Sequence, residues 1–269
     1  MKSFFKTYIL QSNSLKRAVL PIYTFINNCK NKIKGKRIYR RNKKTYSKLN
    51  RYDNFRVVRK NCFPCLTDRY EKAGTLGNYF WQDLWAARLI AENNPKSHFD
   101  IGSRVDGFVG HLASFRDNIK LIDIRALENV IPGVEFVQAD ATELKEIEDS
   151  SVESLSALCS LEHFGLGRYG DPIDPEACFK AMKAIQRVVM KGGNIYIAVP
   201  IGHEHLEFDA HRVFFASTIV DTFDSCKLVE FSCIHASDKV IEKNVDIHKY
   251  DNDKEIGGGR FGLFHFLKC

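Results

Sequence analysis

A chain of 269 residues is long enough for one substantial domain with an appendage and too short for two full domains. Its formal charge of +7 is divided unevenly, because residues 1–60 hold 18 lysines and arginines against one acid, whereas the remaining residues hold 22 bases and 32 acids. The eight cysteines are scattered, and their one close pair, Cys62 and Cys65, lacks the second pair or nearby histidines of a zinc site. We therefore expect reduced structural thiols and no metal.

The basic segment, residues 1–60, begins with mixed apolar and basic positions up to residue 28 and then carries a base at nearly every second position. This pattern predicts an arm that is partly an amphipathic helix and otherwise disordered. Three roles are open to it: contact with an anionic membrane surface, packing on the domain as a solvated arm, and binding to nucleic acid. The segment shows no zinc finger, recognition helix or RNA-binding motif, which disfavours nucleic acid.

No apolar run in the sequence approaches the about 20 residues that span a bilayer. The apolar run Ala18–Ile26 is interrupted by Pro21 and is followed by no small-residue cleavage site. We therefore expect a cytoplasmic protein, either free or peripheral at the inner face of the membrane.

A helical lead-in is expected over residues 61–95, because apolar residues recur at helical spacing between Gly77 and Asn93. Residues 96–269 then alternate between short apolar strands and helices. The expected strands are 98–102, 119–123, 134–137, 152–160, 194–199, 227–235 and 261–268, and the expected helices are 105–115 and 175–190. Lys191-Gly-Gly193 is expected to end the second helix. The alternation predicts an α/β domain whose mostly parallel sheet is covered by helices on both faces.

Ligands of such sheets bind at the carboxyl ends of the central strands, where the strand order reverses. Asp100 and Gly102 end the first strand and precede a glycine-containing turn whose backbone N–H groups can receive an anionic group. Asp123 ends the second strand, where it can accept hydrogen bonds from ribose hydroxyls, and Asp140 ends the third, where it can accept the exocyclic amine of an adenine. A dinucleotide-binding fold also has a glycine turn and a later acid, so these positions alone do not identify the cofactor.

A longer set of motifs separates the two kinds of cofactor site. In order along the chain these motifs are Asp100-Ile-Gly102, Asp123, Ala139-Asp140, Leu161-Glu-His163 and Arg187-Val-Val-Met-Lys-Gly-Gly193. The set resembles the class I S-adenosylmethionine-dependent methyltransferases. The resemblance implies a Rossmann-like, doubly wound seven-stranded sheet with an antiparallel hairpin at its edge, and S-adenosylmethionine as the cofactor. It also implies that Asp123 holds the ribose, Asp140 the adenine, and the segment around Gly102 the methionine moiety.

Residues 75–225 resemble one family more closely. The motifs that carry this resemblance are Gly77-Asn-Tyr-Phe-Trp-Gln-Asp83, Asp100-Ile-Gly-Ser-Arg-Val-Asp-Gly107, Glu162-His-Phe-Gly-Leu-Gly-Arg-Tyr-Gly-Asp171 and Pro200-Ile-Gly202 with His211-Arg212. They are similar to the DUF268 family, a set of methyltransferase-like proteins whose bacterial members are associated with surface-polysaccharide gene clusters. This resemblance implies a fold more firmly than an activity.

The turn after the first strand departs from the usual methyltransferase pattern, because Arg104 and Asp106 stand where the second and third glycines are expected. Arg104 can pair with the carboxylate of the cofactor's methionine moiety, and Asp106 can bind its amine. Alternatively, the two side chains block the close approach of the cofactor. The predicted cofactor-binding residues are Asp100, Gly102, Ser103, Arg104, Asp106, Asp123, Ile124, Asp140 and Ala141.

The loops after the fourth and fifth strands are expected to bind the methyl acceptor. His163 and His211 are candidates for a general base because each lies just beyond a strand end, and Glu162 is a third candidate catalytic residue. The alternative for either histidine is a structural hydrogen bond within its loop. Arginines in these loops can clamp a phosphate or carboxylate of the acceptor or form ion pairs with Asp171 and Asp209. The predicted acceptor-binding residues are Arg168, Tyr169, Asp171 and Arg212.

Three functions are consistent with these patterns. The leading prediction is an S-adenosylmethionine-dependent methyltransferase that O-methylates a sugar or glycan intermediate in surface-polysaccharide biosynthesis, so that its partner is a small-molecule or glycan acceptor. The alternative is a catalytically silent Rossmann-like scaffold that binds a nucleotide or nucleotide-sugar, which the altered turn favours. A nucleic-acid methyltransferase is disfavoured, because Asp171-Pro-Ile-Asp174 is not the Asn/Asp-Pro-Pro-Tyr pattern of base-methylating enzymes.

Overall fold

The computed structural model describes residues 13–70, 74, 76–235, 237, 240–255 and 259–269. The chain divides between Thr75 and Leu76 into two compact units. The sequence predicts boundaries at residues 60 and 95 instead, because the helix before the first strand has the pattern of a separate lead-in. That helix lies in the second unit, together with the sheet.

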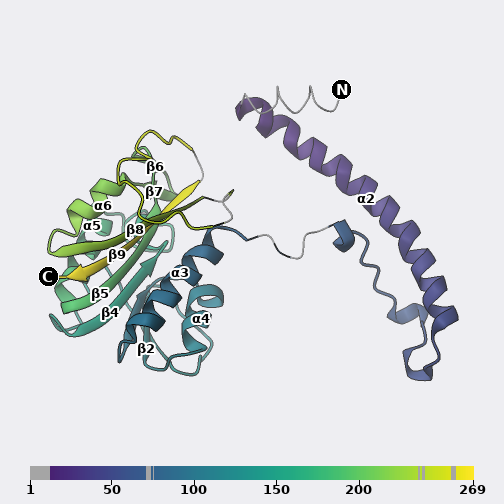
Figure 1. Ribbon diagram of the computed structural model, residues 1–269, viewed down its shortest axis with the longest axis horizontal. Coiled ribbons are helices and arrows are strands. Elements are labelled where there is room, and N and C mark those ends of the chain that lie inside the picture. Colours follow the sequence, from purple (N-terminus) through teal and green to yellow (C-terminus); the bar gives the residue numbers. More distant parts are fainter. Residues whose placement is uncertain (1–12, 71–73, 75, 236, 238–239, 256–258) are drawn as a thin grey trace. The chain divides into compact units, whose positions relative to one another are not determined.

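The first unit contains one long helix, α2 (Asn13–Leu49), which extends through the segment expected to be partly disordered (Figure 1). Lysine and arginine are good helix formers, and one face of α2 also contacts the returning chain. Gly35 lies where a side chain would collide with the carbonyl of Leu66. Three single-turn 3-10 helices follow α2, at Asp53–Phe55, Arg59–Asn61 and Asp68–Tyr70. Within the described ranges, every helix is too short or too polar to cross a bilayer.

The second unit is built on a seven-stranded sheet in the order β3-β2-β1-β4-β5-β9-β8 (Figure 1). Its strands are β1 (His98–Ile101), β2 (Ile119–Asp123), β3 (Val134–Gln138), β4 (Val152–Leu158), β5 (Val189–Pro200), β8 (Cys226–His235) and β9 (Arg260–Lys268). Strands β1 to β5 are parallel, and β9 lies antiparallel between β5 and β8. This order, with its reversal at β1 and its antiparallel edge hairpin, confirms the predicted Rossmann-like fold of class I methyltransferases.

Helices cover both faces of this sheet. They are α3 (Asn78–Asn93), α4 (Gly110–Ala113), α5 (Ala177–Val188) and α6 (Ala216–Thr222), and a π-helical turn at Val105–Val109 precedes α4. Helices α5 and α6 pack on a buried cluster that includes Leu155 and Ile197. Helices α3 and α4 pack on a second cluster, which includes Tyr196. Successive residues of a strand point to opposite faces, which explains why Tyr196 and Ile197 join different clusters.

The junction between α5 and β5 differs from the expectation. Helix α5 ends at Val188 and β5 begins at Val189, so Lys191-Gly-Gly193 does not end the helix. This tripeptide instead forms the irregular start of the strand, where Gly192 has a φ of +78°. A Cβ on Gly193 would lie 3.0 Å from the carbonyl oxygen of Glu153 on the neighbouring β4. The glycines therefore allow the two strands to approach closely where their register shifts.

Two short strands after β5 were not expected. Strands β6 (His205–Glu207) and β7 (His211–Val213) form a separate antiparallel pair, and α6 follows them. Strands of three residues are too short to show an alternating pattern, which is why periodicity does not find them. They place His211 on a strand rather than in a free loop.

Candidate active site

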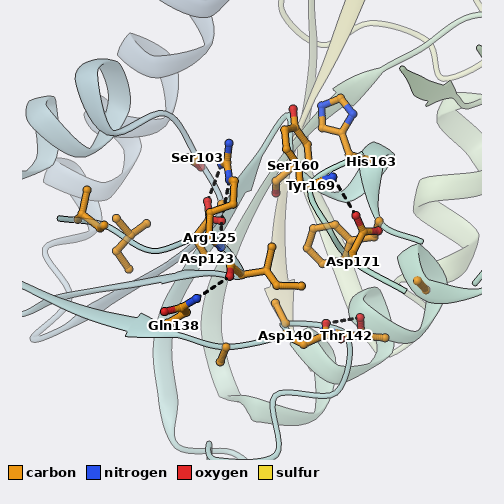
Figure 2. A pocket seen from close by; sticks show the side chains of 18 of the residues that line it. Ser103, Asp123, Arg125, Gln138, Asp140, Thr142, Ser160, His163, Tyr169 and Asp171 are labelled. Carbon is orange, nitrogen blue, oxygen red and sulfur yellow. Dashed lines mark hydrogen bonds and ion pairs between the residues drawn. The ribbon is translucent and has the colours of Figure 1, made fainter. Parts of the chain in front are cut away.

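A cavity of about 880 Å³ opens at the carboxyl ends of β1, β2, β3 and β4 (Figure 2). The strand order reverses here, as expected for a ligand site, and the volume is typical of ligand pockets. The predicted site residues that line it are Gly102, Ser103, Arg104, Asp106, Asp123, Ile124, Asp140, Ala141, His163, Tyr169 and Asp171. Lining side chains that the sequence did not single out include Tyr79, Arg125, Cys159 and Ser160.

The buried carboxylate of Asp100 holds the turn after β1 through hydrogen bonds. The backbone N–H and the hydroxyl of Ser103 donate to this carboxylate at 3.0 and 2.7 Å, and the hydroxyl of Ser156 donates to it as well. Burial raises the pKa of Asp100 to about 6. Asp100 is fully buried and lies outside the cavity lining, so it positions the turn rather than forming the predicted cofactor contact.

Gly102 forms the floor of the cavity in a conformation that favours glycine. Its φ is +65°, and a Cβ there would lie 3.1 Å from the Cβ of Ser160 on the neighbouring loop. Gly107 is required for a different reason, because its Cβ would lie 2.5 Å from the carboxylate of Asp83 on α3. Gly102 therefore leaves room at the cavity, and Gly107 allows α3 to pack against the turn.

Arg104 and Asp106, the residues that depart from the usual glycine pattern, pair with each other. The guanidinium of Arg104 donates to the carboxylate of Asp106 at 3.0 to 3.2 Å and lies 5.1 Å from the ring centre of Tyr79. Its hydrogen bond holds the pKa of Asp106 below the ordinary value. Both side chains line the cavity without filling it, so one wall offers a positive and a negative group side by side.

Asp123, at the end of β2, is held by a residue that the sequence analysis missed. Its carboxylate accepts hydrogen bonds from the backbone N–H of Arg125 at 2.9 Å and from the guanidinium at 2.7 and 3.0 Å (Figure 2). The guanidinium also lies 4.5 Å from the ring centre of Tyr169. A ribose at Asp123 therefore has to compete with Arg125 for the carboxylate. The only signal in the sequence was a base two residues after the acid.

Among the described residues, hydrogen bonds reach only one of the two carboxylate oxygens of Asp140. This oxygen accepts the backbone N–H of Thr142 at 2.8 Å and the hydroxyl of the same residue. The apolar side chains of Ile124, Phe136 and Ala141 line the cavity nearby. An exposed carboxylate oxygen beside apolar walls can accept an amine on the edge of a flat aromatic ring.

His163 is the predicted catalytic residue that lines the cavity. Its Nδ1 lies 2.6 Å from the carbonyl oxygen of Ala210, which can only accept, so Nδ1 carries the proton and Nε2 has a free electron pair. The ring packs edge-on against Tyr169, with 5.4 Å between ring centres. Burial lowers the pKa of His163 to about 4. The imidazole is therefore neutral near pH 7 and is a weaker base than the sequence suggested.

Glu162 and His211, the other predicted catalytic residues, lie behind His163 and outside the cavity lining. Glu162 is 2% exposed, and burial raises its pKa to about 8, so its carboxyl is mostly protonated at neutral pH. One of its oxygens has no hydrogen-bond partner within the described chain, and the other lies 3.7 Å from Nε2 of His163. The ring centre of His211 is 6.3 Å from that of His163. Neither residue reaches a ligand in the cavity directly.

The predicted acceptor-binding arginines bind backbone carbonyls. Arg212 donates to the carbonyls of Glu162, Phe164 and Pro175 at 3.4, 2.6 and 3.2 Å. Arg168 donates to the carbonyl of Ala210 at 2.9 Å. Neither forms an ion pair with Asp171 or Asp209 in the part of the chain that the structure describes, and neither lines the cavity. Arg212 therefore fixes the loop after β4, and the expected clamp on an acceptor is not formed by this side chain.

Asp171 organises the same loop while its side chain faces the cavity (Figure 2). Its carboxylate accepts the backbone N–H groups of Gly165, Gly167 and Tyr169 at 2.7, 3.3 and 3.2 Å. Three donors on one carboxylate hold the loop around Tyr169 in one conformation. The loop that brings His163 and Tyr169 to the cavity is therefore fixed from two sides, by Asp171 and by Arg212.

Residues 126–253 match the model of a family described as "Caenorhabditis protein of unknown function, DUF268". The resemblance to DUF268 that the sequence suggests is thereby confirmed, although the matched segment begins and ends later than the expected 75–225. Comparison with curated proteins gave no significant match.

Solved structures of methyltransferases show a similar arrangement. The 1,6-didemethyltoxoflavin-N1-methyltransferase of Burkholderia thailandensis is 13% identical, with 70% of this chain and 79% of that chain covered and a TM-score of 0.49. An S-adenosylmethionine-dependent methyltransferase of Methanosarcina mazei is 15% identical, with coverages of 67% and 96% and a TM-score of 0.48. A methyltransferase-like protein of Bacillus halodurans is 15% identical, with coverages of 68% and 99% and a TM-score of 0.45. The fold assignment itself rests on the strand order of the sheet.

Proposed function

We propose that this chain, which combines a DUF268 segment with the class I methyltransferase fold, is an S-adenosylmethionine-dependent methyltransferase. The observation that carries the proposal is the convergence of the Gly102 turn, Asp123 and Asp140 on one cavity, each at the end of a successive strand. S-adenosylmethionine needs an acceptor for ribose hydroxyls, an acceptor for the adenine amine and partners for a zwitterionic amino acid. The cavity offers each of these.

The side chains that line the cavity complement each part of S-adenosylmethionine. Asp123 would accept the ribose hydroxyls, and Asp140 would accept the adenine amine through its second carboxylate oxygen while Ile124 and Ala141 contact the ring. The Arg104–Asp106 pair carries a cation and an anion, which complement the carboxylate and the ammonium of the methionine moiety. Gly102 supports this fit, because its missing side chain leaves space at the floor of the cavity.

The bound cofactor would supply an electrophilic methyl group on its sulfonium sulfur. The chain's contribution is then mainly to orient an acceptor, since methyl transfer depends strongly on alignment. His163 is neutral with Nε2 unprotonated, and Nε2 would accept a hydrogen bond from an acceptor hydroxyl in competition with the carboxyl of Glu162, which lies 3.7 Å from it. The lowered pKa of His163 favours this hydrogen bond over early removal of the proton.

We further propose that the methyl acceptor is a hydroxyl of a sugar or glycan intermediate in surface-polysaccharide biosynthesis. Its support is the resemblance to DUF268 proteins, together with the polar and aromatic groups around His163. Tyr169 lies edge-on to this histidine and, like Tyr79 and Asp171, lines the cavity, although the two rings already contact arginines and the carboxylate already binds backbone N–H groups.

One observation favours a second function, a silent module that binds a nucleotide or nucleotide-sugar. The guanidinium of Arg125 occupies the carboxylate of Asp123 and lies in the cavity, where it could turn to a phosphate instead. This function predicts that a nucleotide-sugar binds more tightly than S-adenosylhomocysteine, the product form of the cofactor.

Calorimetry of the full chain with S-adenosylhomocysteine tests the proposal. We expect binding by the parent protein and an affinity loss on the order of 100-fold in Asp123→Ala, because two hydrogen bonds to a carboxylate disappear. Glu135→Ala is the matched control, since it removes an exposed acid of β3 outside the cavity and should bind normally. No binding by the parent protein would exclude the methyltransferase, and binding of a uridine diphosphate sugar alone would favour the silent module.

A further inference from the structure

The first unit carries a row of bases along one face of α2. Helix α2 contains no acid. At alternating spacings of four and three residues it carries Lys30, Lys34, Arg37, Arg41, Lys44 and Lys48. Side chains at these spacings lie on the same face of a helix. All six residues are exposed, and the row extends over about 27 Å at 1.5 Å per residue. We call this row the basic stripe.

Part of the opposite face of α2 contacts the returning chain of the same unit. Gly35 is buried, and Ile38 and Tyr39 are partly buried, at positions between those of the stripe. Gly35 touches the backbone of Leu66, and the ammonium of Lys43 lies 3.3 Å from the sulfur of Cys62. Within the described part of the unit, contacts therefore fix which face packs, and the basic stripe lies on the face that points to solvent.

Exposed apolar side chains lie among the bases. Ile26 and Ile33 are 45% and 62% exposed, and each stands one helical turn before a base of the stripe. Such a mixture suits the boundary of a lipid bilayer, where ammonium and guanidinium groups reach phosphates while apolar groups enter the acyl region. A nucleic-acid backbone satisfies the bases but offers no apolar phase to the isoleucines.

We propose that α2 lies along the surface of an anionic lipid bilayer, with the basic stripe on the headgroups and Ile26 and Ile33 inserted beside it. Each lysine or arginine at such a surface strengthens binding about fivefold. The attraction is screened by salt, since the Debye length is only about 8 Å at physiological ionic strength. This surface acts independently of the proposed methyltransferase site, because it needs only residues of the first unit.

Co-sedimentation of the full chain with lipid vesicles tests the surface. One set of vesicles contains phosphatidylcholine alone, and the other contains about one third phosphatidylserine. We expect binding to the anionic vesicles only, and release when the salt concentration is raised. The triple variant Lys34→Gln, Arg37→Gln, Arg41→Gln should bind on the order of 100-fold more weakly, and glutamine keeps the helix. Circular dichroism checks that α2 is intact.

The matched control is Lys183→Gln, Lys191→Gln, Lys243→Gln, which removes the same charge from exposed positions of the second unit and should bind like the parent. Ile33→Gln should weaken vesicle binding on the order of 10-fold. Equal losses in both triple variants, equal binding to neutral vesicles, or no sedimentation of the parent would overturn the proposal. So would vesicle binding that Ile33→Gln leaves unchanged while a short RNA binds through the stripe, because that result identifies a nucleic-acid surface.

Discussion

Glu162 links the folding of the second unit to pH. Its carboxyl group is almost fully buried beside His163, and one oxygen lacks a hydrogen-bond partner in the described chain. Burial raises the pKa of Glu162 to about 8, from an ordinary value of 4.5. The folded protein therefore keeps this group protonated over a pH range in which the unfolded chain ionises it.

The sign of this effect follows from the two pKa values. Below pH 4.5 both states are protonated and the group stabilises the fold fully; as the pH rises through about 8 that stability is lost. The loss amounts to about 1.4 kcal/mol per pH unit, or about 2 kcal/mol between pH 6.5 and 8. Asp83 and Asp100 have pKa values raised only to about 6, so these two groups change little in this window. His163 is neutral in the folded protein but titrates near its ordinary value in the unfolded chain, which stabilises the fold slightly as the pH rises; this contribution is the same in the parent and in Glu162→Gln and cancels in their comparison.

Urea unfolding at pH 6.5 and pH 8 measures the difference. Fluorescence reports on the second unit, because both tryptophans, Trp81 and Trp85, lie in α3. The parent protein should lose about 2 kcal/mol more than Glu162→Gln over this interval, since glutamine keeps the size of the side chain and cannot ionise. Glu135→Gln, at an exposed acid of β3, should follow the parent. An equal pH dependence in the parent and in Glu162→Gln would refute the reasoning.

Three further substitutions test the site. Gly102→Ala should lower the free energy of unfolding by about 1–2 kcal/mol, because its φ is +65° and the new Cβ would lie 3.1 Å from that of Ser160; urea unfolding measures it. Arg125→Gln should tighten binding of S-adenosylhomocysteine several-fold in calorimetry, because Asp123 loses its internal partner. Arg212→Ala should lower the melting temperature by several degrees, since three hydrogen bonds to loop carbonyls disappear.

Matched controls separate these effects from general damage. Gly110→Ala lies near the same turn but at a φ of −61°, where alanine is not strained, and should leave stability unchanged or raised. Arg168→Ala removes an exposed arginine from the same loop as the carbonyl partners of Arg212 and should change the melting temperature less. Equal losses of folding stability in Gly102→Ala and Gly110→Ala would contradict the strained conformation assigned to Gly102. Weaker cofactor binding by Arg125→Gln would show that this guanidinium holds the ligand.

The sheet and the acids at its edge could be predicted from the sequence. Short apolar runs separated by helical spacing specify parallel strands, and an acid directly after such a run must lie at the carboxyl edge. Asp123 and Asp140 were found in this way, and both line the cavity. Local patterns suffice for these positions because the strand itself determines where its last residue lies.

The partners of the site residues could not be predicted in this way. Tyr79 lies on α3 and reaches the cavity only through the packing of that helix, and Arg125 has the spacing of an ordinary loop residue. Asp100 belongs to the expected motif, yet hydrogen bonds to Ser103 and Ser156 direct it into the core. Arg212 was expected to face an acceptor because arginines often do. Which group a side chain contacts is decided by tertiary structure, and sequence spacing alone does not specify it.

A crystal structure of the full chain with S-adenosylhomocysteine tests the central claim most directly. We expect the ligand in the cavity at the ends of β1 to β4, its ribose hydroxyls on Asp123, its adenine amine on Asp140, and its carboxylate on Arg104. We also expect Arg125 to give up at least one of its hydrogen bonds to Asp123. A ligand bound elsewhere, or a cavity that stays empty at saturating ligand with the Asp123–Arg125 pair intact, would contradict the assignment of this cavity to S-adenosylmethionine.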